Sequence, residues 1–128
     1  MDPHDYLDGG TVAVAPTEYA ICRMEGTEPP ASAFAVVRDD TETTAVVDER
    51  DGVPDAATAV SRGWKRLTFE MELPFELVGF LAVVADELAR AGVSIYALSS
   101  YSTDHVLVTE SDLDAAVDRL DSLGCVVR

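Results

Sequence analysis

The sequence predicts an α+β fold with an antiparallel sheet, and three observations in its second half carry this prediction. Residues 67–73 alternate apolar and polar side chains, the pattern of a strand with one buried face. Residues 77–91 and 113–120 repeat apolar side chains at helical spacing, and each stretch is followed by a glycine that can end a helix. Short β-rich segments separate and follow these helices. The order is therefore strand, helix, strand, strand, helix, strand: the ferredoxin-like βαββαβ motif, with both helices on one face of the sheet.

The elements of this second half follow local signals. Pro74 is expected to end the first strand, and Gly79 to lie in the first turn of the helix after it. Ser111 is expected to cap the second helix, with Asp114 three residues later as a shorter capping box. The remaining strands are short and apolar, and are expected at residues 93–99, 106–109 and 125–127.

The first half of the chain carries weaker signals. Residues 1–10 are polar and are expected to be a frayed terminus. Pro16 is expected to separate two short strands, and the Ala-rich residues 54–61 predict one short helix. The β-rich segments of this half are residues 11–14, 18–24, 31–37 and 43–47, of which the last two are expected to form a hairpin.

The order of elements also indicates how the chain is divided. A small sheet buries little apolar surface by itself, so its open face needs a cover. We therefore expect two ferredoxin-like units in tandem: a degenerate N-terminal unit at residues 11–62 and a complete C-terminal unit at residues 63–128. No internal sequence repeat supports the N-terminal unit, which depends on element order alone.

Length and composition exclude several classes of protein. The 128 residues fit one ordinary domain or two very small ones, and an apolar content of 48% argues against a wholly disordered chain. No apolar run approaches the roughly 20 residues that cross a bilayer, and the first residues lack the basic start of a signal peptide. We therefore expect a cytoplasmic protein with no membrane partner.

The chain is strongly acidic, with a net charge of −15 and 24 acidic residues against nine basic ones. Such a charge repels nucleic acid and anionic lipid, so neither is an expected partner. One interpretation is an acidic surface for a partner protein, and the other is adaptation to a salty cytosol. Because the acidic residues are scattered through every segment, we favour the second interpretation and expect a halophilic source.

Groups suited to catalysis are few. Cys22 and Cys125 lie in apolar, strand-like runs without metal-site spacing, so two buried free thiols are expected, with no metal and no cofactor. Asp104 and His105 are neighbours, but adjacent strand residues point to opposite faces and do not form a catalytic pair. The sequence has no G-x-S-x-G nucleophile motif. It therefore predicts a protein that is not an enzyme.

Two polar segments are better candidates, for binding rather than catalysis. The turn over residues 75–79 leads into a helix whose first backbone N–H groups lack partners within the helix and favour an anion. The hairpin tip over residues 99–104 carries hydroxyl groups and the carboxylate of Asp104, which can hold an ammonium or a guanidinium. If the two segments meet, they form a pocket complementary to both ends of a free amino acid. The expected ligand-binding residues are Phe75, Glu76, Leu77, Val78, Gly79, Ser99, Ser102, Thr103 and Asp104.

These residues also have structural interpretations. Gly79 suits close approach of a ligand to the backbone, and it equally suits close packing of the helix on the sheet. Asp104 can bind a cation, or it can accept hydrogen bonds within its own turn. Serine and threonine are ordinary residues at the ends of strands. The sequence leaves both interpretations open at each position.

Several stretches of the chain resemble a known family. Residues 77–85, 88–95 and 113–116 are similar to ACT domains, the small-molecule-sensing modules attached to many amino-acid biosynthetic enzymes. The string SSYSTDHVLV at residues 99–108 is similar to short tandem-ACT proteins related to the cytosolic arginine sensors (CASTOR) and to the regulatory domains of aspartate kinases. The resemblance covers most of the chain and is most specific over residues 63–109.

The resemblance implies where a ligand would bind. In such domains the ligand lies where the first strand turns into the first helix, usually between two ACT units, and this position corresponds to residues 75–79. The tip over residues 99–104 corresponds to the segment that closes the pocket. Many ACT domains carry an acidic residue and a Pro-Gly pair in that turn. This chain keeps Gly79 in a longer and more apolar turn, so the resemblance does not identify the ligand.

We therefore expect a non-catalytic regulatory protein that binds an amino acid, forms a homodimer and has a regulated enzyme as a partner. A small sheet with uncovered edges tends to pair with a copy of itself, and ACT-like proteins commonly assemble this way. The alternative is a structural or interaction module that has no ligand of its own and docks another protein on an exposed sheet edge. Stabilisation by one particular amino acid would separate the two, and turnover of a substrate would indicate a small enzyme instead.

Overall fold

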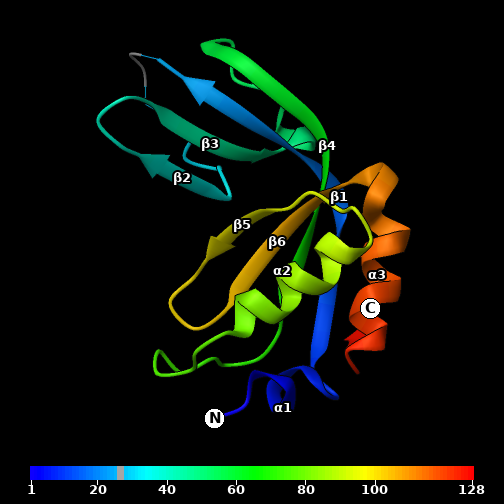
Figure 1. The fold of residues 1–128 in the computed structure, drawn as a ribbon. Coiled ribbons are helices and arrows are strands. Elements are labelled where there is room, and N and C mark those ends of the chain that lie inside the picture. The colour runs from blue at the N-terminus through cyan, green and yellow to red at the C-terminus, as the bar shows by residue number, and fades with distance from the viewer. Residues whose placement is uncertain (26–27) are drawn as a thin grey trace. The chain divides into compact units, whose positions relative to one another are not determined.

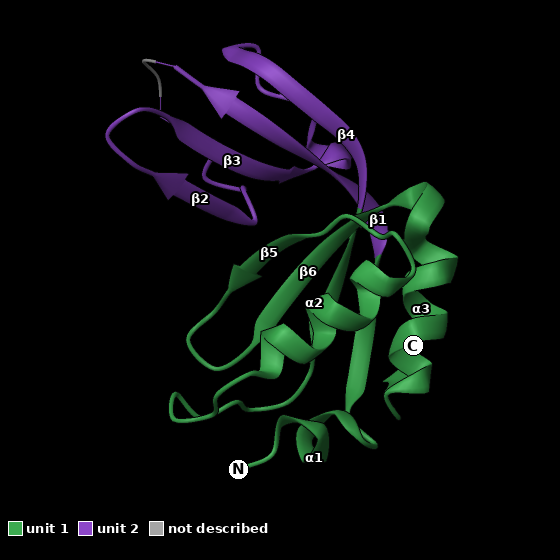
Figure 2. Ribbon diagram, in the orientation of Figure 1, with its two compact units in different colours: residues 1–15, 65–128 green, residues 16–64 purple. Residues whose placement is uncertain are grey.

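The computed structural model describes residues 1–25 and 28–128, and these residues form two compact units (Figure 1 and Figure 2). Unit 1 comprises residues 1–15 and 65–128, and unit 2 comprises residues 16–64. Two long strands, β1 (Thr11–Met24) and β4 (Ala57–Phe69), begin in one unit and end in the other. The first residues of β1 therefore belong with the C-terminal half of the chain.

Unit 1 contains the predicted order of strands and helices. After β4 come α2 (Phe80–Arg90), β5 (Tyr96–Ser99), β6 (Asp104–Thr109), the short 3-10 helix η2 (Glu110–Asp112), α3 (Leu113–Ser122) and β7 (Val126–Val127). The strands lie in the order β7-β1-β4-β6-β5, with β5 antiparallel to β6. Helices α2 and α3 lie beside each other on one face of these strands (Figure 1). The predicted α+β fold, with an antiparallel sheet and helices on one face, is confirmed.

The N-terminal residues complete the sheet of unit 1. The start of β1 lies between β4 and β7, and it pairs in parallel with β7, so that Thr11 is opposite Val126. Before it comes a short helix, α1 (Pro3–Leu7), whose first turn is capped by the Asp2 carboxylate accepting from the backbone N–H of His4 at 2.9 Å. Leu7 is fully buried. The predicted frayed terminus is therefore wrong, because burial of Leu7 and the Asp2 cap order these residues.

The core of unit 1 lies between the sheet and its two helices. Phe69 of β4 is fully buried and packs edge-on against Phe80 of α2, with ring centroids 5.3 Å apart. The helical spacing in the sequence selects the buried faces correctly, since Leu88 of α2 and Leu120 of α3 have no exposed surface. The other residues of this cluster with no exposed surface are Leu7, Val12, Leu67, Val84, Val106, Val108 and Ala116.

Unit 2 consists of strands and one 3-10 helix among the residues described. The predicted hairpin is present as β2 (Ala35–Arg38) and β3 (Thr43–Asp48), joined by a turn in which the Asp39 carboxylate accepts from two backbone N–H groups and the Thr41 hydroxyl. These hydrogen bonds lower the pKa of Asp39. The 3-10 helix, η1 (Glu49–Asp51), follows β3. Because the described part of residues 16–64 holds no α-helix, the expected second ferredoxin-like unit is not confirmed.

Two predictions in the first half are wrong. Pro16 does not break the strand, because β1 runs without interruption from Thr11 to Met24. Proline keeps a strand-compatible φ and removes only one N–H donor, so a long strand tolerates it. Residues 54–61 do not form a helix, because β4 already begins at Ala57. Local alanine content favours a helix there, but pairing with β1 and the β-branched Thr58 and Val60 favour a strand.

Smaller differences occur in the second half. Ser111 does not cap the second helix: it lies in η2, and α3 begins after Asp112 with no side-chain cap bond. The first strand of the motif ends at Phe69 rather than at Pro74, and the strand expected over residues 93–99 begins at Tyr96. Hydrophobic periodicity extends beyond the paired residues, since Met71 and Leu73 still pack on the core after the strand has ended.

Cys22 and Cys125 are free and buried, as predicted. Burial raises the pKa of the Cys125 thiol to about 11, so it stays protonated and unreactive near neutral pH. None of the helices formed by the described residues is long and apolar enough to cross a membrane.

Candidate functional site

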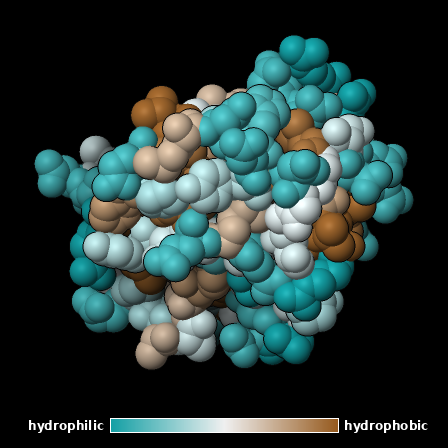
Figure 3. Space-filling view, turned by 90° about the horizontal axis from the view of Figure 1, so that it is seen from below, coloured by the Kyte–Doolittle hydropathy of each residue, from teal (hydrophilic) through white to brown (hydrophobic). Residues whose placement is uncertain are grey.

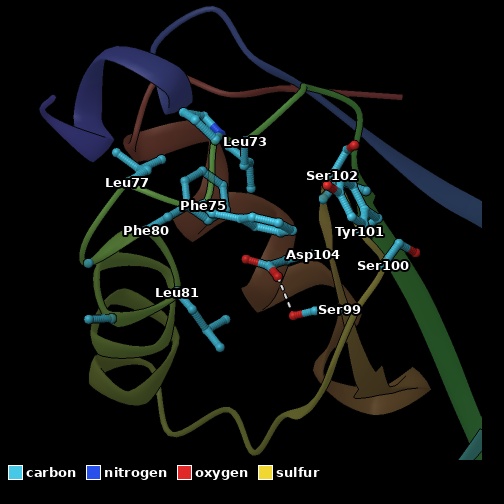
Figure 4. A pocket seen from close by; sticks show the side chains of 14 residues that line it. Leu73, Phe75, Leu77, Phe80, Leu81, Ser99, Ser100, Tyr101, Ser102 and Asp104 are labelled. Atoms are coloured by element: carbon cyan, nitrogen blue, oxygen red, sulfur yellow. Dashed lines mark hydrogen bonds between the residues drawn. The ribbon is translucent and has the colours of Figure 1, made fainter.

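A cavity of about 420 Å³ lies in unit 1, between the segment that follows β4 and the tip of the β5–β6 hairpin (Figure 4). Its volume falls within the range of small-molecule sites. The lining is apolar on the helix side and polar at the tip. The lining residues are Leu73, Pro74, Phe75, Leu77, Gly79, Phe80, Leu81, Ala82, Ser99, Ser100, Tyr101, Ser102, Thr103 and Asp104.

The turn before α2 supplies one side of the cavity. The N–H of Leu77 donates to the carbonyl of Pro74 at 3.0 Å, which closes a tight turn. Gly79 follows as the N-cap of α2 with φ +89°, a left-handed conformation that other residues adopt only at a cost. Because glycine has no side chain, it provides no cap for the first N–H groups of the helix. The positive end of α2 is therefore available to an external anion.

The hairpin tip supplies the other side, and three hydrogen bonds hold its shape. The N–H of Ser100 donates to the carbonyl of Thr103 at 2.9 Å, which closes the turn of the tip. The N–H of Leu73 donates to the carbonyl of Ser102 at 2.7 Å, which ties the tip to the turn before α2. The hydroxyl of Thr103 donates to the carbonyl of Phe69. Both walls of the cavity are thus fixed to each other and to the end of β4.

Of the residues that line the cavity, Asp104 carries a formal charge. It begins β6 opposite Ser99 of β5, and the hydroxyl of Ser99 donates to its carboxylate at 2.6 Å. Its side chain points into the space between the tip and α2 (Figure 4). Among the described residues, Asp104 takes part in no ion pair. A half-buried carboxylate in a cavity with one apolar wall favours a cation, which would form charge-assisted hydrogen bonds with it.

An aromatic pair joins the two walls. The ring of Phe75, from the turn before α2, contacts the ring of Tyr101, from the tip, with centroids 4.7 Å apart and planes at 58°. Both side chains are largely exposed, Phe75 at 72% and Tyr101 at 81%. Aromatic rings attract cations over their faces, so the pair adds to the preference set by Asp104.

The structure brings the two segments chosen from the sequence to one cavity. Seven of the nine expected residues line it; Glu76 and Val78 are exposed and do not. Whether these seven bind a ligand stays a prediction. Sequence reasoning left out Leu73, Pro74, Phe80, Leu81, Ala82, Ser100 and Tyr101. Helical spacing places Leu81 and Leu77 on one face, and this signal could have added Leu81 to the expected site.

The polar groups of the lining are hydroxyl groups and the carboxylate of Asp104. No group of three or more His, Cys, Asp and Glu side chains among the described residues could hold a metal ion. Asp104 has a serine hydroxyl as its partner and no base beside it. The carboxylate at the tip and the uncapped N-terminus of α2 suit recognition of a small zwitterion or cation.

Comparison with known proteins finds one matching family, and the match covers most of unit 1. The ACT domain family matches residues 59–122, half of the 128 residues. No curated protein matches the sequence significantly. The resemblance to ACT domains is therefore confirmed, whereas the tandem arrangement and the closer likeness to arginine sensors are not.

Three solved structures share the fold over nearly the whole chain. An X-ray structure of a protein from Agobacterium tumefaciens has 25% identity and a TM-score of 0.80, covering 94% of this chain and 92% of that one. A Vibrio cholerae protein of unknown function, described as a possible transport protein, has 20% identity and a TM-score of 0.68, with 92% of each chain covered. The ligand-free regulatory subunit of aspartate kinase from Thermus thermophilus has 10% identity and a TM-score of 0.64, covering 89% of this chain and 95% of that one.

Proposed function

The chain belongs to the ACT domain family, and from this premise we propose that it is a non-catalytic regulatory protein that binds a free amino acid in the cavity of unit 1. The likeness in fold to a regulatory subunit of aspartate kinase supports a regulatory role. The partner that we propose for it is a regulated enzyme.

A single observation carries the proposal: an uncapped helix N-terminus and one carboxylate border the same cavity. The N–H groups at the start of α2 suit the carboxylate of an amino acid. Asp104, supported by Ser99, suits an ammonium or a guanidinium. Each end of the amino acid thus meets a group of the opposite charge. A hydrophobic metabolite or a simple anion would not match both of these groups.

The amino acid would act by linking two segments of unit 1. The turn before α2 and the hairpin tip are joined in the free protein by the Leu73–Ser102 hydrogen bond and the Phe75–Tyr101 contact. A ligand held by both segments stabilises the arrangement in which they are close together. A partner that prefers one arrangement would respond to the ligand through this difference in free energy.

We expect one or two of the twenty amino acids to raise the melting temperature in a thermal-shift screen in molar KCl. At 100 times its dissociation constant, a ligand stabilises the folded state by about 2.7 kcal/mol. For a chain of this size, that corresponds to a rise of several degrees. Asp104→Asn is expected to lose most of this rise, because the uncharged amide cannot pair with the ligand's cationic group.

The matched control is Asp118→Asn, which makes the same charge change at an exposed position on α3. It should respond to the ligand as the wild type does. If no amino acid moves the wild type, the interaction-module interpretation replaces this proposal. An amino acid that stabilises wild type and Asp104→Asn equally would mean that the protein is a sensor with its pocket elsewhere.

We further expect a homodimer in molar KCl, with twice the chain mass of 13.7 kDa by light scattering. Val78, Phe75 and Tyr101 are large, apolar or aromatic, and mostly exposed in the single chain. Covering them with a second copy would remove apolar surface from water. Val78→Glu should favour the monomer. A mass of one chain over a hundredfold range of concentration would contradict the dimer.

A further inference from the structure

His105 is the one polar or charged side chain that is buried among the described residues, at 7% exposure. It follows Asp104 in β6, and its neighbours Val106 and Val108 belong to the core beneath the helices. Val106 directly follows His105 in the strand, and adjacent strand residues point to opposite faces of the sheet, so the side chain of His105 points away from this core. His105 therefore lies behind the pocket tip, on the side of the sheet away from α2, and it does not line the cavity.

Two hydroxyl groups hold the imidazole of His105. Its Nδ1 lies 2.9 Å from Oγ1 of Thr68 in β4, and its Nε2 lies 2.7 Å from Oγ of Ser100 in the tip. Arg66 donates to the same Thr68 oxygen at 2.8 Å. Arginine is only a donor, so the Thr68 oxygen accepts from Arg66, and the same hydroxyl group can either donate to Nδ1 of His105 or accept from it. In either neutral tautomer of His105 one ring nitrogen donates and the other accepts, so the imidazole bridges Thr68 of β4 and Ser100 of the tip.

Ser100 connects this network to the pocket. It lines the cavity through its position in the tip, but its hydroxyl points away from the cavity centre (Figure 4). Its backbone N–H closes the turn of the tip by donating to Thr103. A bond from His105 to the Ser100 side chain therefore fixes the turn that carries Ser99 and Asp104.

We propose that His105 is a positioning residue of the ligand pocket: it holds Ser100 from behind and so fixes the tip that presents Asp104 to the ligand. This inference rests on the proposed function, since a positioning role in the pocket requires that the pocket binds a ligand. The effect of His105 on the tip, however, can be measured in the protein without any ligand.

The charges around His105 favour its neutral form. Burial lowers the pKa of His105 below the ordinary value of 6.5, Arg66 lowers it further, and Asp104 acts in the opposite direction. From β5, its cross-strand neighbour is the uncharged Leu98. The folded protein therefore holds His105 neutral above about pH 6.5, and the stability that goes with the neutral form is lost as the pH falls through the lowered pKa. An imidazolium would also repel a cation bound at Asp104, so affinity for a cationic ligand should fall in the same direction.

The first test uses amide hydrogen exchange of the free protein at neutral pH. The amides of Ser100 and Leu73 report the tip, because they donate to Thr103 and Ser102. His105→Phe and Ser100→Ala should each make them exchange roughly tenfold faster, the effect of losing one hydrogen bond. His105→Gln keeps one donor and one acceptor and should restore slow exchange. The amide of Leu120 in α3 should not change in any variant.

The second test titrates L-arginine into the protein by calorimetry from about pH 5.5 to about pH 8. Wild type and the control His4→Gln should bind more weakly as the pH falls, whereas His105→Gln should lose most of this dependence. His105→Phe and Ser100→Ala should each weaken binding about tenfold, and the double variant should be no weaker than either, because both remove the same bond. L-citrulline, which keeps the α-ammonium but has an uncharged side chain in place of the guanidinium, should bind poorly throughout.

The outcomes separate the two proposals. Unchanged exchange at Ser100 and Leu73 in His105→Phe would overturn the role of His105. Failure of all twenty amino acids to bind the wild type would overturn the proposed function instead, and the exchange result would still decide whether His105 fixes the tip. If His105→Phe does not fold, Ser100→Ala gives the decision, because it removes the hydroxyl that the imidazole contacts, and unchanged exchange of the Leu73 amide in that variant would overturn the role of His105.

Discussion

Phe69→Ala is expected to lower the free energy of unfolding by about 3–5 kcal/mol, more than any other single change considered for unit 1. Phe69 has no exposed surface, and its ring packs edge-on against Phe80. Removing it leaves a cavity between β4 and α2 that the surrounding side chains fill only in part. Since whole domains are stable by only about 5–15 kcal/mol, the variant should be close to unfolding.

Urea denaturation in molar KCl measures this effect, because urea does not change the ionic strength. The matched control is Phe75→Ala, which removes the same side chain from a position that is 72% exposed. It should cost less than about 1 kcal/mol. Equal losses in the two variants would mean that the core of unit 1 is not centred on Phe69 and Phe80.

Removal of salt is expected to destabilise the wild-type protein strongly. The net charge is −15, and in Figure 3 hydrophilic side chains cover most of the visible surface, with apolar atoms in separate patches. Two like charges about 20 Å apart repel by about 0.2 kcal/mol in unscreened water, and fifteen unbalanced charges form many such pairs. The Debye length grows from about 3 Å at 1 M to about 30 Å at 0.01 M salt, so dilution exposes these pairs to one another.

Melting curves over a series of KCl concentrations measure this effect. We expect the melting temperature to fall continuously as KCl is diluted from molar to millimolar at neutral pH. The control is the same series near the sequence pI of about 4.2, where the net charge is close to zero and the dependence on KCl should become small. A melting temperature that stays constant at neutral pH would contradict both the repulsion argument and the proposed halophilic source.

Periodic patterns in the sequence predicted the parts of the fold that bury a regular face. The spacing of Val84 and Leu88, and of Ala116 and Leu120, marks the inward faces of α2 and α3, and all four are buried. The pairing of the N-terminal segment with β7 could not be predicted in this way. No local pattern identifies a partner strand at the other end of the chain, and pairing with β1 also overrode the helix propensity of residues 54–61.

The candidate site was predictable to the extent that it depends on turns. Gly79 and the polar tip mark the two places where the backbone changes direction, and the structure brings both to one cavity. The contribution of Tyr101 depends on its contact with Phe75, and that of His105 on bonds to Thr68 and Ser100. Contacts across strands and between loops depend on tertiary packing, so the sequence pattern does not contain them.

The parallel pairing of β1 with β7 has a consequence for how the protein folds during synthesis. Unit 2 is one continuous stretch of chain, so all its strands are available once residue 64 has left the ribosome. The sheet of unit 1 closes only when Val126 and Val127 reach Thr11 and Val12, almost a whole chain length later. Contacts this distant in sequence form slowly, because a long loop must close first. Until then the start of β1 can pair with β4 but has an open edge on the side that β7 will occupy, and aggregation or chaperone capture competes with folding at this stage.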